Sequence, residues 1–174
     1  MRSKIINYYE NHRSHYSSYH NHKEVSAWAG LALFVFFSGI VNLVTIPSNY
    51  ELLAVRAITV LVLIVTFLVY RYISTQLKMK DLGGAYTAAS ICLINDLISE
   101  SITDDELSDY LIVEEAPDVE AQSRQVLPSK LLKKAEVLNT RGRGFQDTTR
   151  LMIYSILSLV SVLVICSKWS QFVS

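Results

Sequence analysis

Apolar residues gather in three long runs along the chain, not in the short periodic stripes of a soluble fold. The first run, Val25 to Ile46, has 22 residues and no charge, and the third, Leu151 to Ser167, has 17 residues and no charge. The second, Leu52 to Tyr70, is interrupted only by Arg56. About 17 to 25 apolar residues in a helix match the thickness of a bilayer core. The pattern predicts an all-α membrane protein with three transmembrane helices.

The intervening polar segments predict four parts. Residues 1–24 form a cytoplasmic helix rich in His and Tyr, and residues 25–74 a transmembrane helical hairpin. Residues 75–148 form a helical cytoplasmic insert, first acidic and then basic, and residues 149–174 a third transmembrane helix with a short outer tail.

Local signals divide the insert further. Gly83-Gly84 is expected to break the helix that leaves the second span. Residues 85–101 then fit an amphipathic helix with Ile91, Ile94 and Ile98 on one face and Leu97 at its edge. Two further helix starts are predicted, at the Thr103-x-x-Glu106 capping box and at Pro128.

The distribution of basic residues predicts the orientation. Fourteen of the 16 Lys and Arg residues precede the first span or lie between the second and third spans. Basic residues are retained on the cytoplasmic side, so we expect the N-terminus and the insert inside the cell and the C-terminus outside. The expected location is the inner membrane, crossed several times. Arg56, one turn inside the second span, either snorkels to the outer headgroups or lines a pore.

Composition then narrows the function classes. The chain carries 16 basic and 16 acidic residues and no net charge, which argues against direct nucleic-acid binding. Cys92 and Cys166 fall in different predicted compartments, so neither a disulfide nor a metal site is expected between them. No nucleophile elbow, zinc-protease helix or dinucleotide fingerprint occurs. We therefore expect neither an enzyme nor a cofactor.

The N-terminal segment has an unusual aromatic stripe. On a helix, residues three and four positions apart share a face. This spacing joins five residues into a possible interaction seam: Tyr8, His12, His15, Tyr19 and His22. The seam predicts packing on another subunit or on the insert. A metal or pH-sensing role is the alternative, but no Cys or carboxylate completes a tetrahedral set.

Two further groups are candidates for contacts. Ser155, Ser158 and Ser161 recur every three residues in the third span, either as a packing ridge or as the lining of a narrow wet path in an oligomer. Basic residues before that span predict contacts with anionic lipid, alongside a helix whose apolar face (Leu131, Leu132, Ala135 and Leu138) is expected to insert into the inner leaflet. They are Lys130, Lys133, Lys134, Arg141 and Arg143.

One resemblance rests on residues 19–28 and on the order of parts. The run Tyr-His-Asn-His-Lys-Glu, Tyr19 to Glu24, leads into Ala27-Trp28 and a two-span hairpin with a short turn, followed by a cytoplasmic helical portion. This layout resembles the SLATT-type family of small bacterial anti-phage effectors over about the first 100 residues. The resemblance implies an effector that oligomerises and perturbs or permeabilises the inner membrane. The third span departs from that family's pattern.

Two functions follow as hypotheses. The first is an oligomeric, channel-like or membrane-perturbing effector subunit whose partners are lipid and further copies of itself. The resemblance implies anti-phage defence as its setting. The alternative is an accessory membrane anchor that recruits a cytoplasmic protein partner to the acidic stretch 96–120. From Asp81 to Glu120 the chain has 11 acidic residues and no basic one, which favours a basic partner.

Overall fold

The computed structural model describes residues 1–45, 51–99, 102–103, 106–115, 126–141 and 148–173. The predicted turn at residues 47–49 and the Arg141-Gly142-Arg143-Gly144 stretch beyond residue 141 lie outside these ranges. Three helices are long and apolar enough to cross a bilayer, which indicates a membrane location and confirms the helical spans. They are α1 (Arg2–Leu43), α2 (Glu51–Ile98) and α4 (Thr148–Val173).

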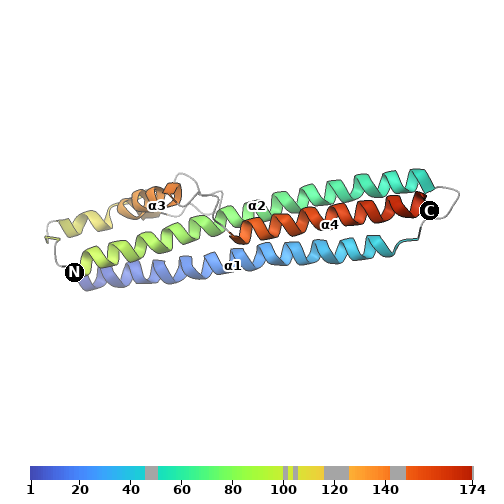
Figure 1. Ribbon diagram of the computed structural model, residues 1–174. Helices are drawn as coiled ribbons and strands as arrows, with labels where there is room; N and C mark the ends of the chain where they lie inside the picture. The colour runs from blue at the N-terminus through green and yellow to red at the C-terminus, as the bar shows by residue number, and fades with distance from the viewer. Residues whose placement is uncertain (46–50, 100–101, 104–105, 116–125, 142–147, 174) are drawn as a thin grey trace. The chain divides into compact units, whose positions relative to one another are not determined.

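The shorter elements follow α2 in the chain (Figure 1). They are the 3-10 helix η2 (Glu106–Leu111), strands β1 (Val113–Glu115) and β2 (Val126–Pro128), and α3 (Ser129–Arg141). The two strands pair antiparallel, with Glu114 opposite Leu127. Sequence reasoning expected helices alone and missed this small sheet, because three-residue strands leave almost no period-2 signal.

The chain divides into two compact units. Unit 1 comprises Met1–His22 and Met79–Phe145, and unit 2 comprises Lys23–Lys78 and Gln146–Ser174. The long helices α1 and α2 each contribute to both units.

Unit 2 is a three-helix bundle with an apolar interior. Its buried residues on α1 follow steps of three and four, the spacing that keeps one face of a helix against its neighbours. The α1 positions Ala27, Leu31, Phe34 and Val41 pack with Val62, Ile73 and Leu77 of α2 and with Ile153, Leu157 and Val164 of α4. The apolar side chains on the outer surface, such as Leu33 and Phe36, suit a lipid environment.

Unit 1 has a separate core with more aromatic residues. Tyr9 and Tyr16 of α1 pack with the last turns of α2, with η2 and with α3. The predicted helix start is confirmed, with one of the two capping-box bonds: the Thr103 N–H donates to the Glu106 carboxylate at 3.0 Å, and η2 begins at Glu106. The Pro128 signal is also confirmed, since α3 starts at Ser129.

The predicted break at Gly83-Gly84 is wrong, because α2 continues through both residues. The two glycines allow α2 and α1 to approach each other closely. A Cβ at Gly83 would lie 3.3 Å from the backbone N of His20 and the backbone O of Tyr16. Close packing against α1 thus favours a glycine here, although the helix does not end.

The predicted apolar face of the segment after Gly84 is also shifted. Ile94 is buried, as expected, but Ile91 and Ile98 are exposed. Leu97, predicted at the edge of that face, is buried, and so is Leu93, which the prediction did not include. Isoleucine positions alone did not reveal which face meets α1, because leucines on the neighbouring face are equally apolar.

Candidate functional site

The three serines of α4 occupy two different environments within unit 2. Ser161 is buried, and its hydroxyl lies 3.0 Å from the Thr66 hydroxyl of α2. Each of these hydroxyls also donates to the carbonyl oxygen four residues earlier in its own helix. Ser155 and Ser158 are exposed on the outside of the bundle. Steps of three rotate the position around a helix, so the three serines do not share one face.

A lysine of α4 holds the end of α1 in unit 2. Lys168 of α4 is buried, and its ammonium donates to the carbonyl oxygens of Asn42 at 2.9 Å and Val44 at 2.8 Å. The Gln171 side-chain oxygen lies 3.3 Å away. Three acceptors match the three donors of an ammonium group. Lys168 thereby caps the C-terminal carbonyls of α1.

Arg56 and two aromatic residues with specific contacts, Trp169 and Tyr72, also lie in unit 2. The side chain of Arg56 is exposed, which leaves both snorkelling and assembly between copies open to it. The Trp169 indole donates to the Thr59 hydroxyl at 3.2 Å. The ring of Tyr72 fits against Gly30, where a Cβ would come within 2.9 Å of it. Small residues in the first span therefore do permit close contact, as expected for membrane helices.

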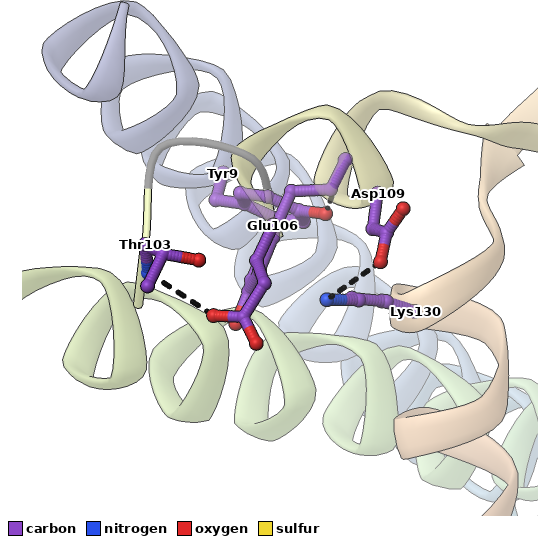
Figure 2. Close-up of polar contacts among 6 residues, drawn as sticks. Tyr9, Thr103, Glu106, Asp109 and Lys130 are labelled. Carbon is purple, nitrogen blue, oxygen red and sulfur yellow. Dashed lines mark hydrogen bonds and ion pairs between the residues drawn. The ribbon is translucent and has the colours of Figure 1, made fainter. Parts of the chain in front are cut away.

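The aromatic face of unit 1 centres on Tyr9 and Tyr16, one position away from the predicted seam. The Tyr9 hydroxyl donates to the backbone oxygen of Tyr110 at 2.8 Å, inside the core (Figure 2). Tyr16 stacks on Tyr86 with ring centroids 4.7 Å apart. Desolvation, with a further contribution from Tyr86, raises the pKa of Tyr16 to about 12. Both phenols are therefore neutral structural groups at physiological pH.

The five seam residues themselves vary in exposure. Tyr8, His12 and Tyr19 are half-buried, whereas His15 and His22 are exposed. His12 lies between aromatic rings, 4.5 Å from Tyr8 by ring centroids, and desolvation followed by the charge of His15 lowers its pKa. Only the half-buried residues of the predicted seam therefore pack within unit 1. The exposed edge remains a prediction for contact with another chain.

His20 forms a specific contact that the seam did not include. Its Nδ1 lies 2.9 Å from the carbonyl oxygen of Lys80 in α2. Because a carbonyl only accepts, Nδ1 carries the proton in this contact. Within the described residues no three His, Cys, Asp or Glu side chains gather as a metal site would require.

The apolar face of α3 packs within unit 1, and the basic residues of this helix lie beside that face. Leu131 and Ala135 are buried in the core of unit 1, with Leu132 and Leu138 packed against it. The expected insertion of this face into the leaflet is therefore corrected: unit 1 supplies the apolar surface that the sequence assigned to lipid.

Lys130 also has partners within unit 1. Its ammonium lies 3.8 Å from the centroid of the Tyr110 ring. It also lies 4.0 Å from the Asp109 carboxylate (Figure 2). Lys133 is exposed and Lys134 half-buried, so lipid contact by these two stays a prediction. The side chain of Arg141 and all of Arg143 lie outside the described residues.

Comparisons with protein-family models, with curated proteins and with solved structures found no match for this chain.

Proposed function

We propose that the protein is a multi-pass membrane effector whose copies assemble into a channel-like or membrane-perturbing oligomer. One observation carries this proposal: Ser155 and Ser158 project from the outside of a bundle whose interior is filled by apolar side chains. Among the described residues of unit 2, apolar side chains make up most of the buried interior, so a single copy shows no continuous polar path there. Polar side chains on a lipid-facing surface favour helix association or a wet path between copies.

The same proposal includes an orientation and a setting. Unit 1 lies in the cytoplasm and the C-terminus outside, on the basis of the basic residues counted above. There unit 1 receives a signal and the spans rearrange, without a catalytic step. Anti-phage defence at the inner membrane is the setting that the SLATT resemblance supports, through the layout of the first 100 residues.

Leakage from liposomes tests the proposal. Vesicles that contain purified protein and an entrapped dye should leak, and a double variant, Ser155→Val with Ser158→Val, should leak several-fold less. Cys166→Val is the matched control, because Cys166 is also a small exposed residue of α4. Vesicles that stay tight with wild-type protein, with and without cytoplasmic extract from infected cells, would exclude a membrane-perturbing effector.

A second candidate function, the accessory anchor, is favoured by exposed acidic side chains on unit 1. Asp96, Glu106 and Asp109 are all exposed, and the core of unit 1 holds their elements in place. A partner with a basic surface should then co-purify from membranes at low salt and be released at high salt. The double variant Asp96→Asn with Asp109→Asn should weaken the recovery of the partner. The control variant Glu10→Gln, in the N-terminal part of α1, should not weaken it. Recovery that is equal for both variants would count against this docking surface.

A further inference from the structure

An exposed stripe on α2 changes from apolar to basic at one end of its membrane span. Its members, Ile64, Leu68, Arg71, Thr75 and Lys78, follow steps of four and three residues, and all five are exposed in unit 2. This spacing places them on one face of the helix. Ile64 and Leu68 belong to the apolar run of a membrane-spanning helix, so the basic residues lie where this face leaves the hydrocarbon.

Two tyrosines mark the depth of this transition. Tyr70 is 44% exposed and Tyr72 is 46% exposed, one on each side of Arg71. Tyrosine rings favour the interface between hydrocarbon and water, which places Arg71 at the level of the phosphate groups. Lys78 lies seven residues farther, about 10 Å along the helix axis. Its side chain leans back toward the span, because helical side chains tilt toward the N-terminus of their helix.

The two basic side chains of the stripe are available to a ligand. Among the described residues, no salt bridge or hydrogen bond joins the side chain of Arg71 or Lys78 to the rest of the protein. The basic residues next to the other two apolar runs differ, since Lys23 of α1 and Arg150 of α4 both have interaction partners within the chain. The charges of Arg71 and Lys78 therefore require counter-charges from outside the protein.

We propose that the phosphate group of an anionic phospholipid binds between Arg71 and Lys78, with its acyl chains along Leu68 and Ile64. The Arg71 guanidinium offers paired donors to phosphate oxygens, and the Lys78 ammonium adds a second positive charge. Thr75 lies between them, and its hydroxyl donates to the Arg71 carbonyl of its own helix at 3.0 Å. A compact side chain at this position leaves room for the phosphate.

Charge and depth together favour a lipid over a protein at this stripe. A second copy in the same membrane has the same orientation, so its α2 would bring like charges to Arg71 and Lys78, and such pairs repel. A soluble acidic partner would contact only the basic end of the stripe and leave Ile64 and Leu68 uncovered. An anionic phospholipid matches both ends, and basic residues near a membrane surface attract such lipids.

Lipid retention tests the site. Full-length protein from nanodiscs of equal phosphatidylglycerol and phosphatidylcholine, released in mild detergent, should carry several-fold more phosphatidylglycerol by native mass spectrometry. The double variant Arg71→Gln with Lys78→Gln should retain several-fold less of it. The control, Arg13→Gln with Lys4→Gln, removes the same two charges from exposed positions in unit 1 and should match wild type. No preference in wild type, or equal losses in both double variants, would overturn the proposal.

Two further measurements identify the occupant. Added inorganic phosphate should not displace phosphatidylglycerol, because it lacks acyl chains, and displacement would overturn the lipid site in favour of a free anion. Thr75→p-benzoylphenylalanine, illuminated in native membranes, should form a phospholipid adduct, whereas Ser14→p-benzoylphenylalanine, exposed in unit 1, should not. A Thr75 adduct with a second copy or with another protein would overturn the proposal.

This inference rests on the membrane location of the helices and is independent of the effector function. Preferential lipid retention together with tight vesicles would keep this site and remove the effector function. Leaking vesicles without preferential retention would keep the effector function and remove this site.

Discussion

A single buried lysine shows how much one side chain contributes to this fold. A helix leaves its last carbonyls without intrahelical partners, and a membrane offers little water to bond them. Lys168 reaches from α4 to one such carbonyl in the last turn of α1, at Asn42, and to that of Val44, the first residue beyond the helix. One residue thereby both caps a helix and holds two helices together.

Lys168→Met should destabilise unit 2 by about 3 kcal/mol, since hydrogen bonds to a charged donor contribute about 1.5–3 kcal/mol each. The free energy of unfolding in detergent micelles measures the effect. Lys78→Met makes the same change at an exposed lysine and should cost less than about 0.5 kcal/mol. Equal losses for the two variants would show that the three contacts of Lys168 do not stabilise the bundle.

His12 predicts a pH dependence of unit 1. Burial is the main cause that lowers its pKa, so the folded state binds a proton more weakly than the unfolded state does. The stability is then complete above the unfolded pKa of about 6.5 and falls as the pH drops below it. The unfolding midpoint of wild-type protein should fall more between pH 7.5 and pH 5.0 than that of His12→Gln. The same fall in both proteins would show that His12 is not responsible.

At the scale of elements, contacts between helices override local helix breakers. α2 is one helix of 48 residues although it contains Gly83-Gly84. Each glycine costs roughly 1 kcal/mol of helix propensity compared with alanine. Burial of Leu93 and Leu97 farther along the same helix stabilises the helical conformation by more than this.

Gly83→Leu should therefore destabilise unit 1 by about 1–3 kcal/mol, the usual cost of overpacking. Its side chain would meet the backbone of α1 at Tyr16 and His20. Ala88→Leu, at an exposed position of the same helix, is the control and should change the stability by less than about 0.5 kcal/mol. Chemical unfolding followed by tyrosine fluorescence provides the measurement, and a stabilised Gly83→Leu protein would disprove the close approach.

At the scale of the whole molecule, α1 and α2 each contribute a polar part to unit 1 and an apolar part to unit 2. The hydrophobic effect separates these parts along each helix, while the helical hydrogen bonds continue through the boundary.

The orientation can be tested with single cysteines in a background without Cys92 and Cys166. A membrane-impermeant maleimide should label Ser170→Cys, near the C-terminus, in cells whose inner membrane is intact and whose outer envelope admits the reagent. It should label Ser17→Cys, in unit 1, only after the inner membrane is opened. Both positions are exposed, so accessibility in the fold does not limit either reaction. Labelling of Ser17→Cys in intact cells would reverse the proposed topology.

Sequence alone determined the three helical spans, the capping box at Thr103 and the start of α3, because each depends on residues close together in the chain. The length of an apolar run and the spacing of Thr103 and Glu106 are local quantities. The apolar composition of each of the three segments likewise indicates that lipid surrounds it.

Only the tertiary structure decided which face of each helix is buried and which polar groups find partners. In the N-terminal part of α1, Tyr9 and Tyr16 are buried in the core of unit 1, whereas His15, next to Tyr16, is exposed. All three have aromatic residues close by in the sequence, so the sequence does not distinguish them. Likewise the residues that flank Lys168 and Ser38 in the sequence do not reveal their partners. The Lys168 ammonium has three acceptors, whereas the buried Ser38 hydroxyl has no hydrogen-bond partner in the part of the chain that the structure describes. Partners of this kind come from segments distant in the chain, and only the packing of one helix on another brings them together.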